Sequence, residues 1–327
     1  MINPPHSGLV WVIGGAIAAL SIGSLARWVS LRGADADVAR SRLGSLKTWW
    51  ALAILLALAL LLGKWGVALL FTFASWLGLR EYLRLVFGQE GDRLTKAVAY
   101  ACVPINYLLI VLQWQTAFTV FVPLVAMLML ITAGVSKRSP GDYFRATAAV
   151  HWGLLLTVYG FSHAVLLFTL PVPESGGAAS AGWFLFLVIL TETDDIAQAL
   201  VGRRIGKHKI TPVISPNKTS EGFAGGLVTS ILLALLLAPW LTPLADSVAL
   251  ERMQLPVPVP YFWAAVAGVL ISLFGFLGDI NMSAAKRAAG VKDGGTLLPG
   301  QGGMIDRIDS LTLAAPSFYY LVAWMSG

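Results

Sequence analysis

Long runs of apolar residues recur along this 327-residue chain and constrain its fold more than any other feature. A helix crosses a bilayer with about 20 mostly apolar residues. Candidate spans that meet or approach this length lie at residues 9–26, 48–62, 65–79, 97–112, 117–135, 147–170, 182–200, 222–241, 261–279 and 310–325. Only 12% of the residues are charged, against about 25% in a soluble domain. We therefore predict an all-α fold, a polytopic transmembrane helix bundle of about 9–10 spans, and exclude a soluble enzyme, a disordered chain and a disulfide-stapled secreted domain.

Three local features refine this prediction. Runs 48–62 and 65–79 are short and separated only by Gly63 and Lys64, so they form either a tight hairpin or one broken span. No Lys or Arg precedes the first run, which favours an uncleaved transmembrane helix over a secretory signal. The single cysteine, Cys102, lies in an apolar run and is expected to be a small buried residue.

Basic residues gather in alternate loops, which predicts the topology. Of the 23 Lys and Arg residues, all but Lys64 and Arg252 lie in one set of five loops. These loops cover residues 27–47, 80–96, 136–146, 201–221 and 280–309. Since cytoplasmic loops carry the excess of Lys and Arg, we place these five loops in the cytoplasm and both termini outside. We interpret the basic pI as topology and lipid-headgroup contacts, and expect no nucleic acid partner.

The Pro- and Gly-rich segment 171–179 separates two regions of different character. Residues 1–180 form an N-terminal transmembrane region of about six spans that contains few unusual polar residues. Residues 181–327 form a C-terminal transmembrane region with loops 201–221 and 280–309, and nearly all the candidate functional residues lie there. We therefore expect the C-terminal region to be catalytic.

An acidic group interrupts the run 182–200 near its cytoplasmic end. Glu192, Asp194 and Asp195 fall within four residues. Carboxylates inside a span cost at least a few kcal/mol unless they face a polar cavity. The helix could instead end near Thr191 and leave the acids solvated, but the apolar turn that follows favours a cavity.

Loop 201–221 is rich in cations and hydroxyl groups and precedes a span that opens with glycines. Such groups beside a helix N-terminus suit an anionic ligand. The residues expected to contact it are Ser215, Lys218, Thr219 and Glu221. The loop lacks the GxxxxGK[ST] frame of a P-loop, and His208 is interpreted as a solvated loop residue.

The segment 279–309 carries the densest group of candidate residues. Asp279, Ser283, Lys286 and Arg287 follow one another at i, i+4, i+7 and i+8, which predicts a shared helix face. Lys292 and Asp293 then precede a glycine-rich turn, residues 300–303, whose backbone N–H groups can approach an anion.

An acidic pair follows this turn. Asp306 and Asp309 are i, i+3 neighbours that can share a cation. Alone, the Asp-Arg-Ile-Asp sequence could be a surface ion pair, but its surroundings favour a functional site.

Carboxylates from several helix ends combined with Lys and Arg indicate a divalent cation bound with a polyphosphate. Mg²⁺ prefers oxygen ligands and is usually held by one or two carboxylates and substrate phosphates. No His or Cys pair has zinc spacing, and no motif for a covalent nucleophile is present. Phosphoryl or nucleotidyl transfer requires neither, because positioning and charge neutralisation supply most of the rate enhancement.

Residues 190–325 resemble the phosphatidate cytidylyltransferase family, also called CDP-diacylglycerol synthases. The matching positions are Ser283, Lys286-Arg287, Lys292-Asp293, Pro299-Gly300-Gln301-Gly302-Gly303 and Asp306-Arg307-Ile308-Asp309, preceded by Asp195, Gly202, Gly206 to Lys209, Ser215-Pro216, Lys218-Thr219, Glu221-Gly222 and Gly225-Gly226. The resemblance implies conversion of CTP and phosphatidate to CDP-diacylglycerol and pyrophosphate with Mg²⁺. It implies contact with membrane lipids at the bacterial cytoplasmic (inner) membrane, with the active site facing the cytoplasm, and leaves a homodimer open.

The resemblance also implies roles for individual residues. Catalytic roles fall on Asp279, Lys286, Arg287, Lys292, Asp293, Gln301, Asp306, Arg307 and Asp309. Substrate contacts fall on Ser215, Lys218, Thr219, Glu221, Ser283, Gly302 and Gly303. The expected metal ligands are Asp279 and Asp306, with Asp195 and Asp309 as further candidates.

Two departures from the family pattern leave alternatives open. Gln301 stands where the family usually has His, and Ile196-Ala197-Gln198-Ala199 stands where a Ser-Gly-Ala-Tyr sequence is common. Gln can donate a hydrogen bond but cannot act as an acid at neutral pH. One alternative is therefore a CTP-dependent transferase on an isoprenoid lipid phosphate. A transporter is a second alternative, although it would place its acids near the middle of the spans.

Overall fold

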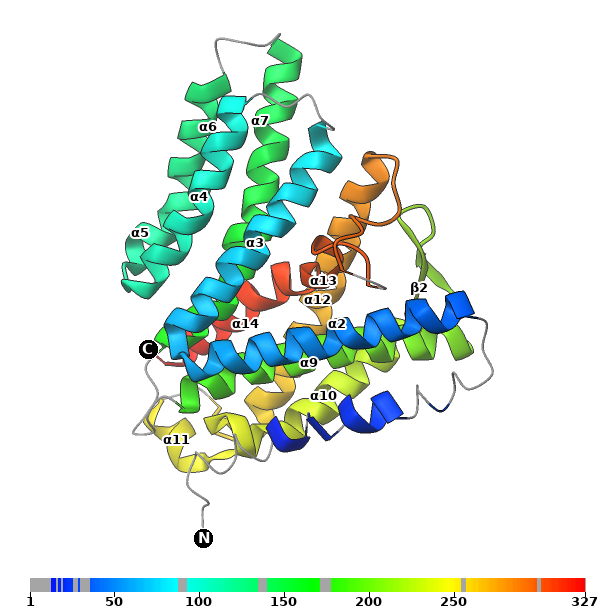
Figure 1. Cartoon of the computed structure of the whole chain (residues 1–327). Coiled ribbons are helices and arrows are strands. Elements are labelled where there is room, and N and C mark those ends of the chain that lie inside the picture. The colour runs from blue at the N-terminus through cyan, green and yellow to red at the C-terminus, as the bar shows by residue number, and fades with distance from the viewer. Residues whose placement is uncertain are drawn as a thin grey trace.

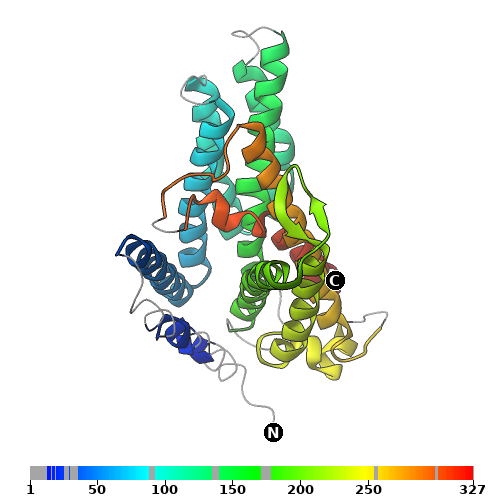
Figure 2. The same ribbon diagram turned by 90° about the vertical axis from the view of Figure 1, so that its right-hand side faces the viewer.

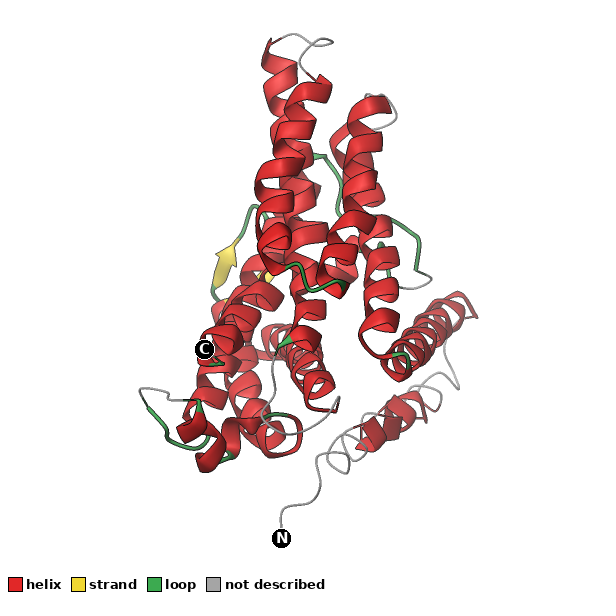
Figure 3. Ribbon diagram, turned by 90° about the vertical axis from the view of Figure 1, so that its left-hand side faces the viewer, coloured by secondary structure: helices red, strands yellow, loops and turns green. Residues whose placement is uncertain are grey.

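The computed structural model describes residues 13–15, 17–18, 20–25, 29, 36–87, 93–134, 140–170, 178–253, 257–298 and 301–326. Almost all of these residues are helical, which confirms the predicted all-α class (Figure 3). The named elements are α2 (Ala36–Leu61), α3 (Gly63–Phe87), α4 (Arg93–Val111), α5 (Gln115–Val120), the π-helix η1 (Phe121–Ala126), α6 (Met127–Gly134), α7 (Pro140–Leu154), the π-helix η2 (Leu155–Gly160), α8 (Phe161–Leu166), the 3₁₀ turn η3 (Leu167–Thr169), α9 (Ala178–Ile205), β1 (Lys209–Thr211), β2 (Ser215–Thr219), α10 (Ser220–Leu241), the 3₁₀ turn η4 (Pro243–Ala245), α11 (Ser247–Arg252), α12 (Phe262–Ala288), α13 (Ile305–Ile308) and α14 (Leu311–Met325).

Six helical segments among the described residues are long and apolar enough to cross a membrane. They are Leu43–Leu61, Arg93–Val111, Gln115–Gly134, Gly141–Thr169, Ser220–Leu241 and Phe262–Ala288. The protein is therefore an integral membrane protein with a polytopic helix bundle. The predicted runs 65–79, 182–200 and 310–325 also lie in helices, namely α3, α9 and α14, which do not meet the same test of length and apolarity. The predicted first span, 9–26, and both chain ends fall partly or wholly outside the described residues.

The helices form two groups that meet at α14. Helices α3, α4, α6 and α7 stand side by side, and α9, α10 and α12 pack together in the second half of the chain (Figure 1). Helix α14 contacts α12 and α9 on one side and α8 and η2 on the other. Helix α2 lies roughly antiparallel to α9 (Figure 1), and both are seen nearly end-on in Figure 2.

The short runs 48–62 and 65–79 form two separate helices, which resolves the alternative of a broken span. Helices α2 and α3 meet at Gly63, whose φ is 61°. Glycine adopts this left-handed conformation without the steric cost that a side chain imposes. Apart from its chain neighbours and the adjoining helix backbone, no atom of the described residues lies within 4 Å of the position that a Cβ on Gly63 would take, so the joint is open on that side.

Close packing of α10 on α9 positions the polar loop between them. A Cβ on Gly226 would lie 2.4 Å from Gln198 Cγ and 2.7 Å from Asp194 Oδ1, so only glycine fits there. The loop contains a hairpin that the sequence did not predict, in which β1 pairs antiparallel with β2. Thr219 ends β2 and caps α10 by accepting a hydrogen bond from Gly222 N at 3.1 Å. The hairpin and cap hold Lys218 above α9.

Candidate active site

A cavity of about 830 Å³ lies between α2, α9, α12 and the segment that contains α13. Ten charged residues line it, and together they are called here its polar side: Glu192, Asp195, Arg203, Lys218, Asp279, Lys286, Asp293, Asp306, Arg307 and Asp309. Four apolar residues, called here its apolar side, also line it, and three of them alternate with charged residues along α9: Trp49, Ile196, Ala199 and Leu200. The cavity can therefore hold an anionic group beside an apolar one.

Helix α9 contributes a continuous stripe to this cavity. Glu192, Asp195 and Arg203 line it together with Ile196 and Leu200, at the spacing of one helix face. The prediction that the acids face a polar cavity is confirmed for Glu192 and Asp195. Asp194 points elsewhere, as described below.

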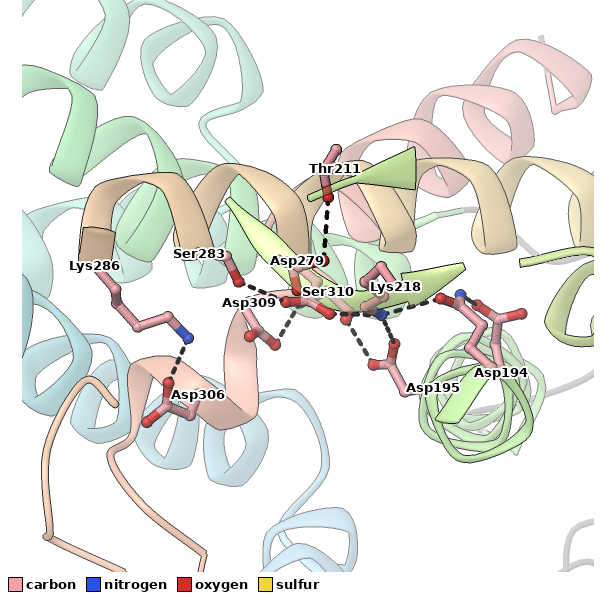
Figure 4. Close-up of polar contacts among 12 residues, drawn as sticks. Asp194, Asp195, Thr211, Lys218, Asp279, Ser283, Lys286, Asp306, Asp309 and Ser310 are labelled. Atoms are coloured by element: carbon pink, nitrogen blue, oxygen red, sulfur yellow. Dashed lines mark hydrogen bonds and ion pairs between the residues drawn. The ribbon is translucent and has the colours of Figure 1, made fainter. Parts of the chain in front are cut away.

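Lys218 is the centre of the polar side (Figure 4). Its Nζ lies 2.6 Å from Asp279 Oδ2 and 3.9 Å from Asp195 Oδ1, and it donates to Gln198 Oε1 at 3.0 Å. Burial opposes the charged form of Lys218, but the carboxylates of Asp279 and Asp195 outweigh it and raise the pKa of Lys218 above its ordinary value. The lysine is therefore a fixed positive charge at the site.

Asp195, Asp279 and Asp309, called here the carboxylate cluster, are held in place by hydroxyl and backbone donors. Ser310 Oγ donates to Asp195 Oδ2 at 2.6 Å, and Ser310 N donates to Asp309 Oδ1 at 2.9 Å. Ser283 Oγ donates to Asp279 Oδ1 at 3.2 Å. Burial, reinforced by the charges of Asp279 and Asp195, raises the pKa of Asp309. The cluster therefore favours an added positive charge.

The carboxylate cluster has the donor chemistry that Mg²⁺ requires. Oδ1 of Asp195 is buried and accepts no hydrogen bond from the described residues, and Lys218 Nζ lies 3.9 Å from it, so this oxygen could still ligate a cation. Asp279 and Asp309 add further carboxylate oxygens beside it. Within the described part of the chain, no three Asp, Glu, His or Cys side chains are arranged to hold a metal ion by themselves. Mg²⁺ is usually held by one or two carboxylates together with substrate phosphates and water.

Asp306 lines the same cavity as Asp309, and the expectation that the two share a cation stays a prediction; its described contacts are with a lysine and with backbone N–H groups. Its Oδ1 is 2.6 Å from Lys286 Nζ. Its Oδ2 accepts from the backbone of Gly294 at 2.9 Å and of Gly303 at 3.0 Å. We call residues 294–303 the glycine loop, of which Pro299 and Gly300 lie outside the described residues. The loop does present N–H groups to an anion, and among the described residues this anion is Asp306.

Glu81 of α3 supports the same loop, a role that the sequence did not reveal. Its Oε2 accepts from Ile305 N at 3.0 Å, although 224 positions separate the two residues. A Cβ on Gly295 or Gly303 would come within 2.7 Å of a Glu81 carboxylate oxygen, so the two glycines let the loop close around this side chain. The only signal in the sequence was an acid between Arg80 and Tyr82 at the end of an apolar run.

Asp194 and Gln198 form a second layer behind Lys218. Asp194 accepts from Ser272 Oγ of α12 at 2.9 Å and from Gln198 Nε2 at 2.6 Å. The oxygen of the same Gln198 amide accepts from Lys218. This chain of contacts ties α9, α12 and the hairpin together at the site.

The remaining predicted residues divide into two sets. Asp293, Gln301, Gly302 and Arg307 line the cavity, and the Nε of Arg307 is buried without a partner. Ser215, Thr219, Glu221, Arg287 and Lys292 do not line it. Lys286 and Arg287 separate because each residue turns a helix by about 100°, which keeps i+7 within about 20° of Asp279 but takes i+8 about 80° away.

Two of the residues outside the cavity shape the hairpin instead. Arg287 Nε donates to the carbonyl of Ile214 at 3.1 Å. Glu221 accepts from the backbone N–H groups of Lys207 and His208 and contacts the exposed His208 ring. Arg287 and Glu221 therefore hold the loop that carries Lys218, and their predicted contacts with substrate stay predictions.

Comparison with known proteins identifies the family. Residues 45–325 match the model of the cytidylyltransferase family. The chain belongs to the cytidylyltransferase family. The matched range includes α2 and α3 as well as the second half of the chain, so both groups of helices are part of the family fold.

Individual relatives of this cytidylyltransferase family member agree with that assignment. The chain is 39% identical to the uncharacterized protein YnbB of Escherichia coli K12 over 85% of this chain and 86% of that protein. It is 40% identical to a phosphatidate cytidylyltransferase of Bacillus subtilis over 44% of this chain and 48% of that protein. It is 42% identical to a phosphatidate cytidylyltransferase of Staphylococcus aureus over 41% of this chain and 46% of that protein. The match thus spans about half the length of the relatives that carry an enzyme name.

Proposed function

We propose that the protein transfers the cytidylyl group of CTP to phosphatidate, forming CDP-diacylglycerol and pyrophosphate. The observation that carries this proposal is the composition of the cavity, which joins the carboxylate cluster and several cations to an apolar side. A nucleoside triphosphate with a metal ion fits the polar side, and a phosphorylated lipid requires both sides. Membership of the cytidylyltransferase family supports CTP and a lipid phosphate as the substrates.

The residues of the cavity have distinct tasks in this reaction. Lys286 and Arg307 line it and neutralise phosphate oxygens, and Lys218 keeps Asp195 and Asp279 from repelling the triphosphate. Mg²⁺, when held by the carboxylate cluster, would neutralise the triphosphate and polarise the phosphoryl group under attack.

The reaction needs little proton transfer from the protein. A phosphate oxygen of phosphatidate, already anionic near neutral pH, attacks the α-phosphorus of CTP. A new phosphorus–oxygen bond forms there while the bond to the β-phosphate oxygen breaks and releases pyrophosphate. Because the nucleophile is already charged, positioning and electrostatic neutralisation account for the rate enhancement. This agrees with the absence of a Ser, Cys or His nucleophile motif in the sequence.

The apolar side of the cavity supports a lipid acceptor at the membrane surface. Ile196 and Leu200 are about half exposed, at 51% and 46%, and both line the cavity next to Asp195. Acyl chains that contact these residues would place a lipid phosphate near the carboxylate cluster. The bias of Lys and Arg toward one set of loops supports an active site on the cytoplasmic face of a bacterial inner membrane.

Labelled CTP tests the proposal directly. Purified protein in phospholipid micelles is given labelled CTP, Mg²⁺ and a panel of phosphatidate, isoprenoid glycerol phosphate and polyprenyl phosphate. We expect label to enter the lipid phase with phosphatidate, and Asp279→Asn to lower the rate at least a hundredfold while the exposed Asp142→Asn on α7 leaves it unchanged. Labelling of an isoprenoid phosphate instead would identify a different acceptor, and no incorporation into any lipid would exclude the proposed reaction.

A further inference from the structure

Helix α2 forms one wall of the cavity but is weakly held by the rest of the protein. Trp49 of this helix lines the cavity. Only 11% of the span Leu43–Leu61 is buried, and its main packing partner is α3. Farther along the helix, Ile54, Leu55 and Leu58 are about half exposed. The first part of α2 therefore faces the site, and the second part presents apolar side chains that the described residues leave uncovered.

Side-chain hydrogen bonds hold the part of α2 that faces the cavity. Gln301 Nε2 of the glycine loop donates to the Ser45 carbonyl at 3.0 Å. Trp50 Nε1 donates to Ser24 Oγ at 3.0 Å. At the opposite end the helix joins α3 at Gly63, whose left-handed conformation and open surroundings suit a hinge. Ser45 lies about 24 Å from Leu61 at 1.5 Å per residue, so a small rotation at Gly63 moves Ser45 and Trp49 by several ångströms.

The amide of Gln301 is only half satisfied in this position. Since a carbonyl can only accept, the NH₂ group must face Ser45, and this fixes the orientation of the amide. Its Oε1 is buried and accepts no hydrogen bond from any residue that the structure describes. Burial of an unpartnered carbonyl oxygen costs free energy that is regained when water reaches it. The hydrogen bond to Ser45 therefore fixes the position of α2, and the unpaired Oε1 reduces the free energy that is needed to break this contact.

We propose that Gln301 is a positioning residue that latches α2 onto the glycine loop, so that Trp49 closes the cavity, and that release of this latch opens the cavity on the α2 side to the lipid substrate. The identity of that lipid rests on the proposed function, whereas the latch itself does not. The exposed apolar surface after Trp49 makes this side of the cavity the one that borders lipid.

Cysteine labelling tests the latch without any enzyme assay. The lone Cys102 is buried, so Cys102→Ala provides a cysteine-free background in which Trp49→Cys is introduced. Adding Gln301→Met, which keeps the side-chain length but removes the N–H donor, should raise the rate of labelling by a water-soluble maleimide at least fivefold. A cysteine at the exposed Thr132, at the end of α6, controls for general reactivity and should not respond. Equal labelling rates with and without Gln301→Met would overturn the latch.

A reversible cross-link distinguishes positioning of α2 from direct contact with substrate. In the Cys102→Ala background, Ser45→Cys and Gln301→Cys are joined by a short bis-methanethiosulfonate reagent, which replaces the reach of the glutamine side chain. We expect the reduced protein to be about tenfold less active than the background, the cross-linked protein to recover to within threefold, and dithiothreitol to reverse the recovery. Because both states are one polypeptide, a folding defect cannot explain the difference.

The two experiments also separate the latch from the proposed reaction. Complete cross-linking without recovery would overturn the positioning role and indicate that Gln301 acts on the substrate itself. If the unsubstituted protein fails to use CTP and phosphatidate, the proposed function fails, and the labelling rates still decide whether Gln301 holds α2.

Discussion

Removal of Lys218 provides the sharpest test of the site's electrostatics. Its side chain is 18% exposed and its ion-pair partner Asp279 is 20% exposed, so the pair is largely buried. Breaking a buried pair by deleting one partner costs about 3–5 kcal/mol, because the other charge remains without compensation. We take the lower end, about 3 kcal/mol, for Lys218→Met since both groups keep some contact with solvent. For a chain of this size each kcal/mol lowers the melting temperature by about 2 °C, so the expected decrease is about 6 °C.

A second substitution shows whether the cause is the uncompensated charge. Adding Asp279→Asn removes the carboxylate that Lys218 left behind, so the double variant should regain about half of the lost thermal stability. Asp195 and Asp309 prevent full recovery. The assay is thermal unfolding of detergent-purified protein followed by intrinsic fluorescence, with Lys209→Met, at an exposed position in β1, as the matched control. A melting temperature of Lys218→Met within 1 °C of the unsubstituted protein would refute the reasoning, because it corresponds to a loss of at most ~0.5 kcal/mol in stability. Additive losses of stability from the two substitutions would refute it as well.

Three further predictions address residues around the site. Glu81→Ala should lower stability by about 1–3 kcal/mol, because the backbone N–H group that donates to Glu81 is left buried and unpaired. The same substitution should lower turnover in the CTP assay, and unchanged turnover would refute the role of Glu81 in shaping the glycine loop. Gly226→Ala should cost about 1–3 kcal/mol in thermal unfolding, because its Cβ would collide with Gln198; a neutral substitution would mean that α10 can move away from α9. Ile196→Asp should raise the KM for phosphatidate about tenfold, equivalent to roughly 1.4 kcal/mol, and leave the KM for CTP unchanged; a larger effect on CTP would reverse the assignment of the apolar side.

The sequence predicted the residues of the carboxylate cluster because they obey local rules. Asp279 and Ser283 are four residues apart on one helix, so their contact follows from helical spacing alone. Asp195 stood out because an acid near an apolar run needs a polar environment. The spans could likewise be predicted, because the bilayer core offers no water to the backbone N–H and C=O groups and a single apolar segment satisfies them by forming a helix.

Other parts of the site could not be read from the sequence because they depend on contacts between distant segments. The contact of Gln301 with Ser45 joins positions that are 256 residues apart, and no local pattern encodes it. Asp306 is predicted to share a cation with Asp309, and the fold also brings its oxygens to Lys286 and to the glycine-loop backbone, contacts that the local sequence did not predict. The spacing of the two acids describes their positions along the chain, but it does not predict which donors from distant segments contact them.

The contact between Glu81 and Ile305 has a consequence for the order of assembly. A ribosome that adds roughly 5–20 residues per second needs about 11–45 s to synthesise the residues between them. During that interval α3 already exists, but the backbone N–H that its carboxylate will accept from does not. Burial of a charged carboxylate without its hydrogen-bond partner is costly in free energy. The contact can therefore form only after Ile305 has been synthesised, which makes closure of the glycine loop around Glu81 a late step in completing the active site.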